Sequence, residues 1–231
     1  MHQNLNNLER EGFAWDELPA SDVALLEVIC VGIFAQNSRK FGIRNVVLDS
    51  PHLRGLVDHL MLPVAQRHLH ANAFLVRSTL FDKPSEANWA VPWHQDVTIE
   101  VSEKWETKGY GPWSIKDGLL SVQPPASILE NMLTLRLHFD DTDETNGALL
   151  VEPGSHRLGK LRIDEIVPKN PTVCNCKAGD ILLMKPLLFH ASNQSVSAKP
   201  RRVLHLDFAF EPLPSPLKWR RRFHYSLEKR L

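Results

Sequence analysis

The sequence predicts a mainly β protein, a barrel or sandwich of short strands with helices before it. Short apolar segments follow residue 73 and are separated by turn signals such as Asn146-Gly147 and Pro153-Gly154. These segments do not alternate with long helices, which argues against a parallel α/β sheet. The 231 residues are enough for one domain with a sizeable core. We therefore expect a single domain over the whole sequence.

The first part of the chain, residues 1–70, is predicted to be mainly helical. Ser21 can cap a helix in which apolar residues such as Val23 and Leu26 recur at helical spacing. Two shorter helices are expected at residues 51–60 and 61–70. We expect the helices of this N-terminal part to pack on the β core.

The β core is expected over residues 71–210. Apolar segments between turn signals predict its strands at residues 74–81, 133–140, 148–152, 180–184 and 201–209. Residues 104–125 are interpreted as a long, loop-like insertion, and such loops in compact domains are often functional. Residues 211–231 are interpreted as a C-terminal tail.

The composition excludes several classes of protein. Lys plus Arg and Asp plus Glu both number 27, so no net positive field exists to bind nucleic acid or an anionic membrane. The most apolar segment, residues 23–35, is too short to cross a bilayer. The chain has three cysteines, too few for a dense disulfide framework, and its polar N-terminus does not resemble a signal peptide. We expect a cytoplasmic protein with a small-molecule substrate, without nucleic acid, membrane or an obligate protein partner.

Histidine and aspartate in Trp93-His94-Gln95-Asp96 form the sharpest local signal. On an extended segment, residues two apart point to the same side, so His94 and Asp96 converge while Gln95 points away. His190, near the end of the predicted core, can supply a third ligand. Two histidines and one carboxylate with open positions are the hallmark of non-haem Fe(II) oxygenases. The sequence therefore predicts an iron site.

Arg201 follows His190 by eleven residues and opens the last predicted strand. An arginine fork pairs bidentately with a carboxylate, which is what the distal end of a 2-oxoacid co-substrate requires. Ser192 could add a hydroxyl to the same carboxylate. Arg202 is the alternative to Arg201, because a slip of one residue would exchange which of them points inward.

These motifs occur in a fixed order along the chain. That order resembles the phytanoyl-CoA dioxygenase family, whose members are Fe(II)- and 2-oxoglutarate-dependent oxygenases. The resemblance extends from about residue 74 to residue 209. It rests on WHQD, then NG, PGSH, GD, FHAS and finally PRRVLHLDF.

The resemblance implies a double-stranded β-helix, the jelly roll of cupin-like proteins. It also implies Fe(II), 2-oxoglutarate and O2 as cofactor and co-substrates. By motif match, the iron ligands would be His94, Asp96 and His190, and Arg201 would bind 2-oxoglutarate beside Ser192. Trp113, in the segment after the metal motif, resembles a family tryptophan next to the co-substrate.

Other polar residues lie on the predicted strands. Thr134 and Arg136 alternate with leucines, so one strand face is polar; if it points inward, it needs partners or substrate. Arg136 and Thr134 are thus candidates for a substrate contact. His205 shares a strand face with Arg201 and is a third candidate, with a core histidine as the alternative. Arg77 is a candidate co-substrate contact, with a structural ion pair as the alternative.

Together these observations predict an oxygenase that hydroxylates a small organic molecule while 2-oxoglutarate is decarboxylated to succinate. One alternative is a non-oxidative cupin-type metalloprotein, an isomerase or hydrolase, which would not need Arg201. A second alternative is a small-molecule-binding protein of the same fold, although it would not need to keep all three ligands. Halogenation is disfavoured, because Asp96 occupies the position that chloride would need.

Overall fold

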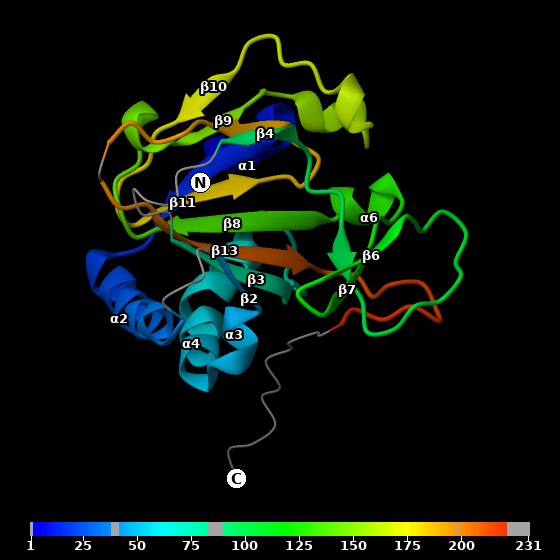
Figure 1. The fold of residues 1–231 in the computed structure, drawn as a ribbon, viewed down its shortest axis with the longest axis horizontal. Helices are drawn as coiled ribbons and strands as arrows, with labels where there is room; N and C mark the ends of the chain where they lie inside the picture. The colour runs from blue at the N-terminus through cyan, green and yellow to red at the C-terminus, as the bar shows by residue number, and fades with distance from the viewer. Residues whose placement is uncertain (1, 38–41, 83–89, 198, 221–231) are drawn as a thin grey trace.

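The computed structural model describes residues 2–37, 42–82, 90–197 and 199–220 (Figure 1). Its helices are α1 (His2–Glu11), α2 (Ala20–Gln36), α3 (Val46–Asp49), α4 (Pro51–Leu56), α5 (Leu62–His68) and α6 (Ala126–Glu130), with a π-helical turn η1 (Val57–Met61) and 3-10 turns η2 (Glu144–Asn146), η3 (Ser155–Leu158) and η4 (Ile163–Glu165). Its strands are β1 (Phe13–Glu17), β2 (Gly42–Arg44), β3 (Phe74–Asp82), β4 (Val91–His94), β5 (Ile99–Glu100), β6 (Trp113–Lys116), β7 (Leu119–Val122), β8 (Met132–His138), β9 (Leu149–Val151), β10 (Thr172–Cys174), β11 (Asp180–Met184), β12 (His190–Ser192) and β13 (Arg202–Ala209).

Two antiparallel sheets form the core. The larger sheet has the order β1-β11-β8-β13-β3-β2, and the smaller one the order β10-β9-β12-β4. In Figure 1 the smaller sheet lies above the larger one, and α2, α3 and α4 lie below it. This arrangement confirms the predicted mainly β jelly roll with N-terminal helices packed on its core. The edge strands β1 and β2 both come from the N-terminal part, which the sequence indicated to be mainly helical.

Helices α2, α3, α4 and α5 cover the outer face of the larger sheet. The buried α2 residues Val23, Leu26 and Cys30 belong to the same apolar cluster as Leu135 and Leu204 of the sheet. The prediction that Ser21 caps this helix was wrong. The amides of residues 22 and 23 donate to the Pro19 carbonyl, so the helix begins before Ser21. Of the helices in the described residues, none has the length and hydropathy to cross a bilayer.

The two short helices expected at residues 51–60 and 61–70 form one continuous helical segment. A π-helical turn, η1, joins α4 to α5, and the Leu62 amide donates to the Val57 carbonyl with the wider π spacing. Pro63, in the first turn of α5, has no N–H to donate, so the regular ladder is interrupted there.

The prediction of a loop-like insertion at residues 104–125 was wrong. The insertion contains the β6–β7 hairpin, which pairs with β5 in a third sheet at one end of the core (Figure 1). The hairpin turns at Asp117 (φ 53°) and Gly118 (φ 73°). Two consecutive positive φ angles and an Asp-Gly pair are typical of a type I′ hairpin turn. This dipeptide was the signal that could have revealed the strands.

The inner face of the larger sheet carries a buried polar cluster around Asp207. Arg77 Nε donates to Asp207 Oδ2 at 2.5 Å, Thr134 Oγ1 donates to Oδ1 at 2.6 Å, and His205 Nε2 lies 3.1 Å from Oδ1. Burial would raise the pKa of Asp207, but Arg77 and His205 lower it overall. The cluster joins the neighbouring strands β3, β8 and β13 by side chains as well as by their backbones.

We expect Asp207→Ala to lower the free energy of unfolding by about 3–5 kcal/mol, because it leaves Arg77 buried without its carboxylate. Since the folded-state pKa of Asp207 is depressed, its contribution is present above the ordinary aspartate value of about 4 and declines as pH falls below it. Urea denaturation of both proteins between pH 3 and pH 7 measures this. Lys177→Ala, in an exposed pair with Asp141, is the control and should change little. An equal loss in both variants would contradict the role of the buried pair.

Candidate metal centre

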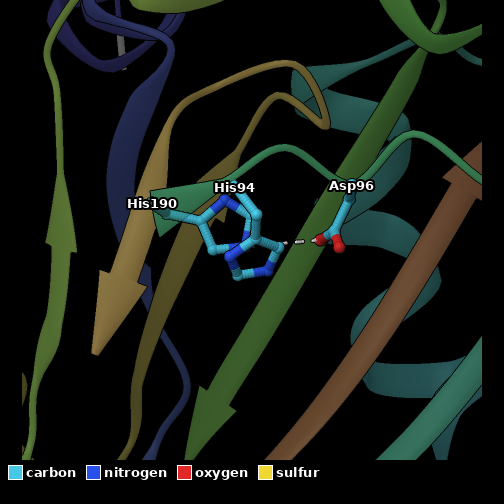
Figure 2. A group of neighbouring side chains, drawn as sticks. All are labelled: His94, Asp96 and His190. Carbon is cyan, nitrogen blue, oxygen red and sulfur yellow. Dashed lines mark ion pairs between the residues drawn. The ribbon is translucent and has the colours of Figure 1, made fainter. Parts of the chain in front are cut away.

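The three predicted ligands meet at the junction of β4 and β12. His94 is the last residue of β4, Asp96 follows two residues later, and His190 opens β12 directly opposite His94. Their ligand atoms all lie within 4.8 Å of one another. Figure 2 shows the two imidazoles and the carboxylate converging, with His190 Nε2 at 3.7 Å from Asp96 Oδ2. The pairing of two strands thus brings together ligands almost a hundred residues apart in sequence.

Backbone carbonyls orient both imidazoles. His94 Nδ1 lies 2.8 Å from the Pro92 carbonyl oxygen, and His190 Nδ1 lies 2.9 Å from that of Leu188. A carbonyl can only accept, so each Nδ1 carries the hydrogen and each Nε2 keeps a free lone pair. Metal-binding histidines are commonly held in this way by their second nitrogen. The residues present therefore fit a mononuclear divalent metal.

The charge states at the site also suit a metal. Burial lowers the pKa of His190 to about 4, so its imidazole is neutral near pH 7. Burial alone would raise the pKa of Asp96, but His190 and Arg77 nearby lower it overall. A neutral imidazole and an ionised carboxylate are the forms that coordinate a divalent cation.

Gln95, between two of the ligands, anchors the metal-binding loop. Its side chain points away from the ligands, as expected, but it is buried and all its hydrogen-bonding groups are used. Nε2 donates to the carbonyls of Gly159 (2.8 Å) and Leu187 (2.7 Å), and Oε1 accepts from the Leu161 amide at 2.9 Å. This role was not predicted from the sequence. A glutamine between two ligands was the available signal, because a buried amide requires partners for every polar atom.

A cavity of about 140 Å³ adjoins the three ligands. Four of the other residues that the sequence singled out line it, namely Arg136, Ser192, Arg201 and His205. The apolar part of the wall was not anticipated and consists of Phe81, Val91, Leu149, Ala191 and Val203. The cavity is below the 300–1,000 Å³ of typical drug-sized ligand pockets, so it suits a ligand of few atoms.

The adjacent arginines at the start of β13 point in opposite directions. Arg202 pairs with Asp140 at 2.6 Å and with Glu27 at 2.7 Å, outside the cavity. Arg201 lines the cavity and has no ion pair within the described residues. Burial, reinforced by the charge of Arg136, lowers the pKa of Arg201 to about 10. The guanidinium packs on Gly147, where a Cβ would lie 3.2 Å from Arg201 Nη1.

Three further candidates lie outside the cavity wall. Trp113 is on β6, packed on a separate apolar cluster beside the third sheet, with Lys104 Nζ at 5.8 Å from its ring centroid. Thr134 and Arg77 both donate to Asp207. Arg77 therefore has the structural ion pair that was the alternative, and its Nη1 also donates to the Thr98 carbonyl at 3.2 Å, just past the metal motif.

A second hollow, a groove of about 640 Å³, begins at His94 and Gln95 and is larger than the cavity. Its far wall is the segment 160–166, where Leu161, Ile163 and Ile166 alternate with charged residues. This groove was not predicted from the sequence, because its wall carries no recognisable motif and comes close to His94 only in the folded chain.

A jelly roll that holds two histidines and one aspartate beside a cavity is the arrangement typical of mononuclear non-haem Fe(II) oxygenases. The chain belongs to the phytanoyl-CoA dioxygenase (PhyH) family, which matches residues 30–203. The resemblance seen in the sequence is therefore confirmed, and the chain is a non-haem iron, 2-oxoglutarate-dependent dioxygenase.

Solved structures share this fold. The non-haem α-ketoglutarate-dependent carbocyclase SnoK of nogalamycin biosynthesis aligns with a TM-score of 0.68 at 15% identity, covering 90% of this chain and 83% of SnoK. EctD from S. alaskensis with bound Fe aligns with a TM-score of 0.69 at 20% identity, covering 90% and 76%. EctD with 2-oxoglutarate and 5-hydroxyectoine gives 0.67 at 19% identity, with the same coverage. No curated protein matches the sequence significantly.

We expect His94→Ala, Asp96→Ala and His190→Ala each to lose most bound iron, because a site with three protein ligands has little redundancy. The iron content of protein loaded anaerobically with Fe(II) and desalted measures this. His156→Ala removes a histidine whose ring bonds the Glu9 carbonyl elsewhere in the fold, and it should keep full iron. Stoichiometric iron in His190→Ala would refute the assignment of the ligands.

Proposed function

We propose that this dioxygenase hydroxylates a small organic molecule and binds 2-oxoglutarate through Arg201. In this reaction 2-oxoglutarate, O2 and R–H give succinate, CO2 and R–OH. One observation carries the proposal: a half-buried arginine without a carboxylate partner among the described residues lines the same cavity as the three metal ligands. A cation partly removed from water is costly unless a ligand pairs with it.

Different residues would bind the iron and the co-substrate. Bound iron supplies the activation of O2 that couples decarboxylation of 2-oxoglutarate to oxidation of the substrate. His94, Asp96 and His190 hold the metal, and the carbonyls of Pro92 and Leu188 fix the imidazole orientations. The chain contributes position and the exclusion of water, while the metal contributes reactivity.

The proposed co-substrate contacts lie at the Arg201 end of the cavity. The Arg201 fork would bind the distal carboxylate of 2-oxoglutarate bidentately, and the Ser192 hydroxyl would donate to the same group. Gly147 supports this arrangement, because any side chain there would meet both Arg201 and the Asn193 carbonyl oxygen, 2.7 Å from the Cβ position.

We place the primary substrate in the groove that begins at His94. It is large enough for a small organic molecule, and its wall offers both apolar and charged side chains. EctD, a protein of the same fold, holds 5-hydroxyectoine in its structure, which supports a small-molecule substrate here.

We further propose that the N-terminal helices and the jelly roll act as one oxygenase unit in the cytoplasm. The placement of β1 and β2 in the larger sheet supports a single unit. The three cysteines are all free and buried, which is compatible with a reducing compartment. A non-oxidative metalloprotein of this fold would not need the cavity-facing Arg201, and a simple binding protein would not need all three metal ligands.

We expect Arg201→Ala to weaken 2-oxoglutarate binding roughly ten- to hundredfold with little loss of iron, because a charged hydrogen-bonded pair contributes about 1.5–3 kcal/mol. Anaerobic calorimetric titration of the Fe(II) protein measures this. The matched control is Arg202→Ala, which removes a neighbouring arginine that pairs with Asp140 instead. It should leave 2-oxoglutarate affinity nearly unchanged, and the reverse pattern would assign the co-substrate to Arg202.

We also expect the iron-loaded protein to convert 2-oxoglutarate slowly to succinate in air without its substrate, through uncoupled turnover. Mass spectrometry of succinate, with ascorbate present, measures this; Asp96→Ala should make none. Absence of succinate above the Asp96→Ala background, across a panel of small metabolites, would favour the binding-protein alternative.

We expect no halogenated product with chloride present, because Asp96 occupies the metal position that chloride would need.

A further inference from the structure

The cavity beside the metal ligands contains two arginines without carboxylate partners. Arg136 and Arg201 both line it, and within the described part of the chain neither forms an ion pair. The buried or half-buried arginines nearby differ in this respect, since Arg77 pairs with Asp207 and Arg202 with Asp140. One unpaired cation accounts for one carboxylate of a ligand. The second arginine therefore requires its own explanation.

Arg136 still has donors to offer. Its Nη1 donates to His205 Nδ1 at 3.0 Å, so His205 Nε2 carries the hydrogen that points to Asp207. Its Nε is buried and has no partner in the described residues. A guanidinium has five N–H donors, and buried donors are rarely left unsatisfied. The unused donors of a half-buried cation facing a cavity indicate an anionic ligand.

The strand register separates the backbone positions of the two arginines. Arg136 lies opposite His205 on β13, whereas Arg201 is four residues earlier on the same segment, about 13 Å along an extended strand. The side chain of Arg136 bonds His205 and lines the cavity together with the three metal ligands. The two guanidinium groups therefore enter the cavity from different positions along the sheet.

We infer that Arg136 binds the metal-proximal carboxylate of 2-oxoglutarate, at the opposite end from the distal carboxylate that Arg201 binds. Each of the two carboxylates of a 2-oxo dicarboxylate would then have a guanidinium donor of its own. Recognition of the co-substrate is then divided between two guanidinium groups, and Arg136 is a specificity-determining residue in its own right. This inference rests on the proposed function.

Two analogues of 2-oxoglutarate separate the two ends. 2-Oxopentanoate keeps the proximal carboxylate and replaces the distal one by a methyl group. 4-Oxopentanoate keeps the distal carboxylate and replaces the proximal one by a methyl group. Binding of all three compounds is measured by calorimetry or ligand-detected NMR on the zinc-loaded full chain, because zinc is redox-inert and permits no turnover.

We expect Arg136→Met to weaken 2-oxoglutarate and 2-oxopentanoate roughly tenfold or more, and to leave 4-oxopentanoate almost unchanged. The matched variant Arg201→Met should show the opposite pattern, weakening 2-oxoglutarate and 4-oxopentanoate while sparing 2-oxopentanoate. Arg136→Lys keeps a positive charge and should restore part of the affinity for 2-oxopentanoate.

Thermal unfolding distinguishes a binding role from a structural one. Methionine replaces a buried cation that has no carboxylate partner, so ligand-free Arg136→Met should have the same Tm as the wild type or a higher one. Added 2-oxoglutarate should raise the Tm of the wild type more than that of the variant. A structural arginine would instead give a lower Tm and no analogue-specific pattern.

The inference is overturned if Arg136→Met weakens 4-oxopentanoate and spares 2-oxopentanoate, which would place Arg136 at the distal end. It is also overturned if the affinities for all three compounds are unchanged. Failure of the wild type to bind 2-oxoglutarate would refute the proposed function itself, a result distinct from either of these.

Discussion

The carboxylate of Asp207 is the charge around which the interior of the jelly roll is arranged. It is buried on the middle strand of three, and it receives Arg77 from one neighbouring strand and Thr134 from the other. Arg77 in turn bonds the carbonyl of Thr98, two residues after a metal ligand. Through His205, Asp207 also fixes the orientation of Arg136. A single buried carboxylate is thus connected by hydrogen bonds to the neighbouring strands, to the metal-binding loop through Arg77, and to the cavity wall through His205.

Some arginines on this face have carboxylate partners and others have none, and this difference separates the structural arginine from those that we propose bind the co-substrate. Arg77 is neutralised within the fold, so it contributes to stability. Arg136 and Arg201 are not neutralised by the described residues, so the ligand-free cavity carries excess positive charge. An interior with every charge paired would be more stable. An anion that pairs with Arg136 and Arg201 would instead gain this free energy when it binds.

The parts of the fold and site that depend on local spacing were predictable. The strand at residues 180–184 was placed with its observed bounds, because turn residues define its start and its composition is apolar. His94 and Asp96 converge because side chains two apart share a strand face, and Arg201 faces the cavity while Arg202 does not for the same reason. The β6–β7 hairpin was missed although its Asp-Gly turn was visible, because the flanking segments were judged by their length and polarity.

The parts that depend on distant contacts were not predictable from spacing. The partners of Gln95 lie more than sixty residues away, and nothing near Gly159 or Leu187 in the sequence indicates that they meet it. The wall of the groove is likewise an ordinary segment of mixed polarity. Arg77 was predicted from its place on a strand before the metal motif, and Trp113 from the resemblance to the family. Packing decides whether such a side chain faces a neighbour or a ligand.

The amide of Gln95 connects the wall of the proposed substrate groove to the loop that carries two metal ligands. It holds the backbone on either side of Lys160, at the beginning of the groove wall, and its own backbone lies between His94 and Asp96. Insertions or deletions that reshape the wall near Gly159 would pull on the loop that carries two ligands. Changes of side chain from residue 163 onward leave this link intact. New substrate preferences in this lineage are therefore expected to arise in the distal half of the wall, while the proximal half stays fixed in length.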